Sequence, residues 1–165
     1  HAQCVRRLIA EGCPRNAQDQ TKDSALATAI RCKALECARV LLDDSPEEVQ
    51  NALLSQNAKG NTALHIAAQV GSDEAAKLVK DALAAEHLPT ALAIQNNRGW
   101  TCLHATVAAS RSGRNGAAVA KLLIRWGADV TCQDKGKHTF ATAVRYYAKQ
   151  PNALSTIFEL AAVAN

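Results

Sequence analysis

Short apolar stretches at helical spacing run along the chain, separated by segments rich in glycine, asparagine, serine and proline. Val5, Leu8 and Ile9 fall on one face of a predicted helix at 4–10, and Gly12 ends it because glycine takes the left-handed conformation of a helix end with least strain. Comparable patterns predict an all-α chain with further helices at 35–42, 46–54, 63–69, 73–84, 102–109, 117–126, 140–149 and 153–164, and one helical turn at 90–95.

Polar residues and prolines mark several helix ends. The segment 45–48, Ser-Pro-Glu-Glu, has the pattern of a capping box with proline at the first helical position, which predicts the helix that follows it. Gly71 and Ser72 are expected to end one helix and cap the next. Pro89 is expected to prevent a continuous helix across Leu88, because proline disfavours the helical conformation of the preceding residue.

One segment of the chain occurs twice. G-N-T-A-L-H-I-A-A at 60–68 returns as G-W-T-C-L-H-A-T-V at 99–107, and weaker copies align at Leu26 and Phe140, which gives intervals of 38, 39 and 37 residues. Both strong copies resemble the T-P-L-H-x-A motif of ankyrin repeats. The resemblance implies a solenoid of helix–turn–helix units with short β-hairpin tips, which acts through an extended surface rather than through a pocket.

The resemblance divides a single ankyrin-repeat domain at 1–165 into five units. The fifth is a capping repeat whose tip is one residue short, with His138 in place of the threonine and Ala141 in place of the histidine. The first lacks its inner helix and the chain has no methionine, so we expect a piece of a longer protein. The units are a partial repeat at 1–18, a repeat with an extra helix at 19–56, repeats at 57–95 and 96–132, and the cap at 133–165.

Composition narrows the class of protein. Apolar residues make up 48% of the chain but aromatic residues only 4%, which suits closely packed helices rather than a β-sandwich. No apolar run is long enough to cross a membrane. The net charge is +4, and the first quarter holds a group of basic residues that could attract an acidic protein segment: Arg6, Arg7, Arg15, Lys22, Arg31, Lys33 and Arg39. Aromatic residues for base stacking are missing there, so specific binding of nucleic acid is not expected.

The six cysteines show neither zinc spacing nor a Cys-x-x-Cys pair. We therefore expect reduced cysteines that act as small buried apolar side chains, and a cytoplasmic or nuclear location. They are Cys4, Cys13, Cys32, Cys37, Cys102 and Cys132.

Candidate catalytic residues are scarce. His65 and His104 occupy equivalent places in two repeats, and the ankyrin resemblance implies that each bonds to backbone at the junction of hairpin and helix while Thr62 and Thr101 cap the inner helices. The chain has no glycine-rich phosphate loop, no G-x-S-x-G and no H-E-x-x-H. We therefore predict no enzymatic activity, no metal, no cofactor and no small-molecule ligand.

A protein partner is instead expected on the tips and the exposed ends of the inner helices. Trp100 is either an exposed hot spot of this surface or packs on the neighbouring tip around Lys59 and Asn61. The predicted partner-binding residues are Lys59, Asn61, Gln69, Arg98, Trp100, Arg111, Lys135 and Lys137.

The third and fourth units also resemble a narrower family. The motif G-N-T-A-L-H at 60–65, a long insertion containing Pro89, and N-R-G-W-T-C-L-H at 97–104 are similar to inhibitors of NF-κB, the IκB family. This resemblance implies a regulator that binds a Rel-type transcription factor. The alternative is a substrate-recruiting or scaffold domain of a larger multidomain protein or a pathogen effector.

Overall fold

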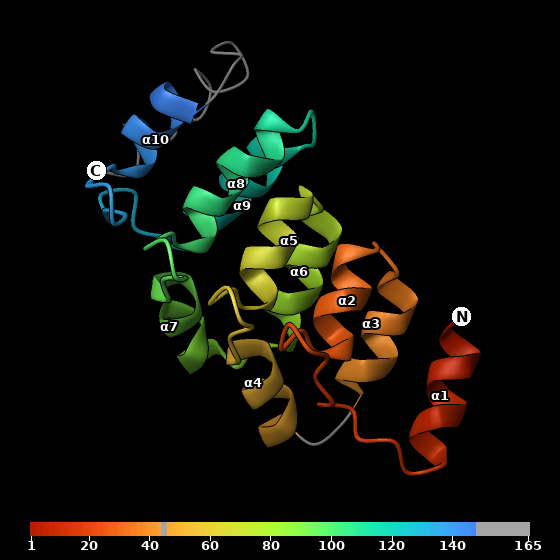
Figure 1. The fold of residues 1–165 in the computed structure, drawn as a ribbon. Coiled ribbons are helices and arrows are strands. Elements are labelled where there is room, and N and C mark those ends of the chain that lie inside the picture. The colour runs from red at the N-terminus through yellow and green to blue at the C-terminus, as the bar shows by residue number, and fades with distance from the viewer. Residues whose placement is uncertain (44–45, 148–165) are drawn as a thin grey trace.

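The computed structural model describes residues 1–43 and 46–147, and within these residues the chain forms a stack of helical pairs (Figure 1). The predicted helix at 153–164 and the last two residues of the predicted helix at 140–149 lie outside the described residues. The helices are α1 (Ala2–Ala10), α2 (Ala25–Arg31), α3 (Leu35–Leu42), α4 (Pro46–Leu54), α5 (Ala63–Val70), α6 (Asp73–Ala82), the 3-10 turn η1 (Ala85–His87), α7 (Leu88–Ala93), α8 (Cys102–Arg111), α9 (Gly116–Arg125) and α10 (Phe140–Tyr147).

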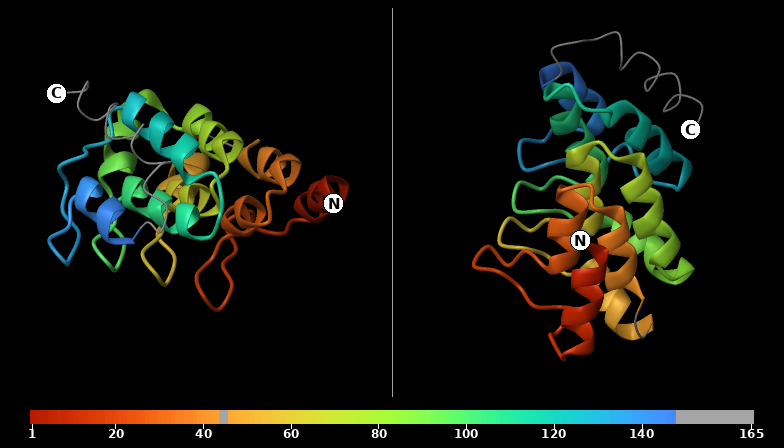
Figure 2. Two further views of the ribbon diagram at one scale, coloured as in Figure 1. Left: turned by 90° about the horizontal axis from the view of Figure 1, so that it is seen from above. Right: turned by 90° about the vertical axis from the view of Figure 1, so that its right-hand side faces the viewer.

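The helices form two layers. Inner helices α2, α5, α8 and α10 pack on one another in that order, and the outer helices α3, α6 and α9 pack on their own inner partners. α1 packs on α3, so it is an outer helix, as the sequence predicts for a unit without an inner helix. The loops between units project from one edge of the stack as parallel fingers (Figure 2).

The insertions are helical too. α4 packs beside α5 and α6, and its bounds agree with the predicted helix at 46–54, although Ser45, its expected cap, lies outside the described residues. No α-helix runs across Leu88, since α6 ends at Ala82 and α7 begins at Leu88 after the 3-10 turn η1, but the expected reason is wrong because Leu88 itself is helical, with φ −59° and ψ −46°. Pro89 is tolerated because it lies in the first turn of α7, where a missing backbone N–H leaves no helical hydrogen bond unmade.

Small apolar side chains fill the interface between the inner helices. Ala67, Ala68, Ala105 and Ala109 are fully buried, and leucine and isoleucine side chains fill the remaining space in the same core. Alanine lets two helices approach closely, which explains why the core needs few rings. None of the described helices is long and apolar enough to span a membrane.

The expectation of six buried cysteines is wrong. All six are free, but Cys37 and Cys102 are the buried ones. Cys4, Cys13 and Cys32 are exposed: Cys4 lies on α1, and Cys13 and Cys32 border the open space beside α1. Burial raises the pKa of the Cys102 thiol to about 12, which keeps it neutral and unreactive.

Candidate binding surface

Each described tip is closed by one side chain. Its first residue is Asp19, Asn57, Asn96 or Asp134, and the Oδ1 atom of that residue accepts hydrogen bonds of 2.8–3.1 Å from the backbone N–H groups of the third and fifth tip residues. Asparagine and aspartate are favoured at such turns because their short side chains reach their own backbone. The tips therefore have the same geometry despite different sequences.

The tips also bond to one another. The backbone N–H of Asn97 donates to the carbonyl of Lys59 at 3.1 Å, and that of Lys135 donates to the carbonyl of Arg98 at 3.2 Å. Gly60 and Gly99 permit this close approach: both have φ +76°, and a Cβ atom would lie 2.6 Å from the backbone nitrogen of Asn97 and 2.5 Å from that of Lys135 respectively. The tips thus form a continuous hydrogen-bonded ridge.

This ridge corrects the alignment of the fifth unit. Its tip begins at Asp134 and its helix cap is Thr139, whose Oγ1 accepts from the N–H of Thr142, so the tip is not one residue short and His138 does not replace the threonine. Thr142, not Ala141, stands where the third and fourth units have histidine. The error came from aligning Phe140 with the motif leucine, whereas buried Phe140 is the first residue of α10 and takes the place of Ala63.

His65 and His104 join each inner helix to the following tip. In His65, Nδ1 accepts from the N–H and hydroxyl of Thr62 at 3.3 and 2.8 Å, and Nε2 donates to the carbonyl of Trp100 at 2.8 Å. His104 makes the same bonds to Thr101 and to the carbonyl of His138. These contacts confirm the implied structural role. They require neutral imidazoles, and burial lowers the pKa of both, that of His65 to about 4.

Trp100 is not the exposed hot spot that one prediction made it. Its side chain is buried, with 9% of the residue exposed, and its Nε1 donates to Asp134 Oδ2 at 3.2 Å. Packing on a neighbouring tip is the better prediction, and the hydrogen bond of the indole runs to the following tip. The same link recurs at the preceding tips, where the fifth residues Asp23 and Asn61 accept hydrogen bonds from Asn57 and Asn96, the first residues of the next tips.

A groove of about 460 Å³ lies between the tips and the inner helices of the third and fourth units. The structure brings five predicted residues together there, although Asn61 and Trp100 are buried and contribute mainly to its walls. Lys135 and Lys137 are exposed on the next tip, and Arg111 is exposed at the end of α8, outside the lining. The lining residues are Ala58, Lys59, Asn61, Gln69, Asn96, Asn97, Arg98, Trp100, Ala108, Ser112 and Arg114.

Sequence analysis missed Arg114, whose Nη1 donates to the carbonyl of Gln69 at 3.2 Å. The available signal was its position in the turn after an inner helix, where a long side chain can reach the preceding unit. The part these residues play in binding stays a prediction, and the groove is the surface on which to test it.

Comparison with known proteins agrees with this architecture. The family model described as ankyrin repeats (3 copies) matches residues 1–88 and 53–134. The chain belongs to the ankyrin-repeat family. It is similar to a solved ankyrin repeat domain from Acinetobacter baumannii AYE, at 25% identity and a TM-score of 0.77, over 99% of this chain and 78% of that one. It is also 26% identical over 132 residues to the E3 ubiquitin-protein ligase KEG of Arabidopsis thaliana, an alignment that spans 79% of this chain and 8% of that protein.

The basic residues of the N-terminal quarter do not form one continuous patch of unpaired charge in this ankyrin stack. Arg7 pairs with Glu11, Arg31 with Asp23 and Arg39 with Glu36. Arg15 donates to backbone carbonyls near the end of α3. Burial would raise the pKa of Asp23, but hydrogen bonds from Asn57 and Arg31 outweigh it and lower the pKa. Several of these charges therefore contribute to local structure.

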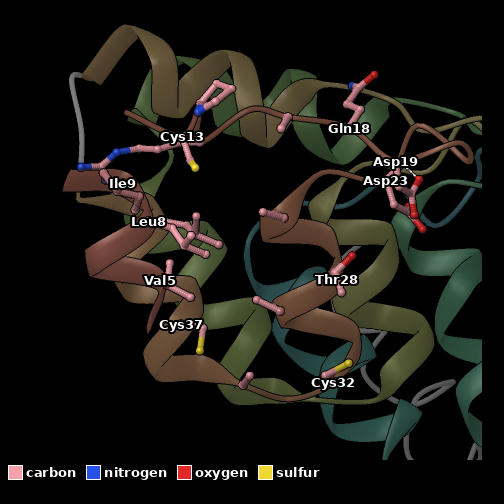
Figure 3. Close-up of a pocket in the computed structure, with 17 residues that line it drawn as sticks. Val5, Leu8, Ile9, Cys13, Gln18, Asp19, Asp23, Thr28, Cys32 and Cys37 are labelled. Carbon is pink, nitrogen blue, oxygen red and sulfur yellow. Dashed lines mark hydrogen bonds between the residues drawn. The ribbon is translucent and has the colours of Figure 1, made fainter. Parts of the chain in front are cut away.

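A second hollow, apolar and about 590 Å³, opens beside α1 at the N-terminal end of the ankyrin stack (Figure 3). Val5 and Leu8 of α1 line one side and Thr28 of α2 lines the other. Leu8 is 53% exposed, so part of this apolar surface faces solvent. The hollow lies where an inner helix packed on α2 would complete the first unit.

Proposed function

We propose that this ankyrin domain is a protein-recruiting module that acts by binding a partner in the groove of Lys59, Arg98 and Arg114, not by catalysis. The observation that carries the proposal is the groove itself, because the tips and inner helices gather polar and basic side chains from two units on one rigid face. A rigid surface loses little conformational entropy on binding, which suits recognition.

The first candidate is a substrate-recruiting or scaffold domain of a larger protein. The similarity to one short part of the ligase KEG supports it. We also propose a cytoplasmic or nuclear location, since the free cysteines suit a reducing compartment.

The second candidate is an IκB-like regulator of a Rel-type transcription factor. The G-N-T-A-L-H and N-R-G-W-T-C-L-H motifs favour it, together with the insertion between them, which forms η1 and α7. In this case the groove and the tips would cover the surface by which the factor enters the nucleus or contacts DNA.

Affinity capture with two matched variants tests the module and separates the candidates. The groove variant carries Lys59→Gln, Arg98→Gln and Arg114→Gln, and the control carries Lys80→Gln, Lys121→Gln and Arg125→Gln on α6 and α9, with the same loss of charge. We expect mass spectrometry to find proteins that the wild type and the control capture and the groove variant loses. A Rel-homology protein among them favours the second candidate. Identical captures by all three proteins would overturn the proposed function.

A further inference from the structure

We propose that the groove recognises an acidic, extended segment of the protein partner. This inference rests on the proposed function and specifies the chemistry of what is bound.

Charge is divided unequally between the two layers of the stack. The four tips with α2, α5 and α8 carry seven lysines and arginines and three aspartates, whereas the outer helices α1, α3, α6 and α9 together with α4 carry seven basic and six acidic residues. Asp23 and Asp134 are buried, and Asp19 uses its carboxylate to close its own tip. The positive field of the described chain is therefore concentrated on the tips and inner helices, where it steers an acidic partner.

The basic side chains of the groove are available to bind an acidic ligand, and contacts within the protein hold two of them in position. Among the described residues, no ion pair involves Lys59, Arg98 or Arg114, and none of the residues that line the groove is acidic. The guanidinium of Arg98 lies 5.4 Å from the ring centroid of Trp100, and Arg114 is anchored on the carbonyl of Gln69. Each guanidinium retains donors for a carboxylate, which it binds in a bidentate manner.

The groove fits a peptide better than a nucleic acid. Trp100 is the aromatic residue of the lining, and its ring is buried with the guanidinium of Arg98 over it, so it is poorly placed for a base to stack on. The amides of Gln69 and Asn97 line the same groove. Each donates one N–H within the protein, to Asn61 Oδ1 and to the carbonyl of Ala58 respectively, and an amide also has a second N–H and an oxygen with which to bond an extended peptide backbone.

Fluorescence anisotropy with defined probes tests the inference. The acidic probe is a labelled peptide of alternating glutamate and serine of about twelve residues, which spans roughly 40 Å when extended. The neutral probe replaces glutamate with glutamine, and the third probe is a single-stranded oligonucleotide of similar length. At about 0.15 M NaCl we expect the acidic peptide to bind and the neutral one not to bind. The groove variant should lose about tenfold in affinity and the outer control less than about twofold.

Three results would overturn the inference. One is an equal loss in the groove and control variants, which would mean general attraction to net charge. Another is groove-dependent binding of the oligonucleotide that is as tight as that of the acidic peptide. The third is no binding of the acidic peptide by folded protein, which a circular dichroism melt verifies. In this last case, groove-dependent capture of proteins in the affinity experiment would leave the proposed function standing, with a partner of other chemistry.

Discussion

The two middle repeats and the two that flank them reach the same tip geometry with different residues. The third and fourth units have glycine at the fourth tip position, where φ is +76°, and histidine in the inner helix. The second and fifth have Lys22 and Lys137 at that position, with φ of 57° and 61°, and Ala27 and Thr142 where the histidine would be. The carboxylate or amide at the first tip position is common to all four. The tip therefore depends on this side chain, and the glycine and histidine add stability.

The histidine should show the largest difference between the two kinds of unit. His65→Ala removes a fully buried side chain and leaves the carbonyl of Trp100 without its partner, so we expect a loss of about 3–4 kcal/mol in the free energy of unfolding. Thr142→Ala at the equivalent place of the fifth unit should cost less than about 0.5 kcal/mol, because Thr142 is exposed. Urea unfolding followed by circular dichroism measures both. Equal losses would mean that the histidine is not what distinguishes the middle repeats.

The sequence predicted the helices well because their apolar spacing is regular: the bounds of α3 and α4 agree with prediction at both ends. Prediction from the sequence failed where a local pattern was compatible with two different structures. Phe140 was aligned with the leucine of the repeat motif because it is apolar, and this shifted the alignment of the fifth unit by one residue. Trp100 was judged by its place at a tip, whereas the direction of its side chain depends on Asp134, which lies 34 residues further along the chain. Long-range partners of this kind are not visible in local spacing.

Acid should weaken the middle repeats first. Because burial lowers the pKa of His65 to about 4 from an ordinary value of 6.5, the unfolded chain takes up a proton on this residue before the folded one does. The contribution of His65 to the free energy of unfolding is therefore fully present above about pH 6.5. It falls by about 3 kcal/mol as the pH is lowered toward 4. His104 adds to the same trend, since burial lowers its pKa too.

Thermal melts between pH 7.5 and 4.5 measure this loss, with His65→Gln as the control that removes the titrating group. The pKa values of Asp23 and Asp134 are lowered from 3.8, so these carboxylates contribute at lower pH and do not obscure the result. A melting temperature that is constant in the wild type over this range would contradict the assignment of neutral, buried histidines.

Replacing a glycine of the middle tips should cost less stability than replacing the histidine. The cost has two sources: strain at a left-handed residue and a clash with the neighbouring tip. Gly99→Ala strains a left-handed residue and drives a methyl group against the backbone of Lys135, for an expected cost of about 2–3 kcal/mol. Gly127→Ala strains a residue with φ +91° but meets no atom within 4 Å, so it should cost about 1 kcal/mol. Urea denaturation measures both costs. The amount by which Gly99→Ala costs more than Gly127→Ala is the part that comes from the close stacking of the tips. If both changes cost the same, the contact between tips is looser than the structure indicates.

The smallest expected effect is a gain in the flanking repeats. Lys137→Gly should stabilise the fifth unit by about 0.5–1 kcal/mol, because it removes left-handed strain that outweighs the added freedom of the unfolded chain. Lys135→Gly on the same tip is the matched control: it removes the same charge from a residue without a positive φ, so it should be neutral or slightly destabilising. A gain from both changes would point to repulsion between the two lysines. A gain from Lys137→Gly alone would mean that the flanking tips retain strained lysines despite a cost in stability, as expected if the positive charge serves binding.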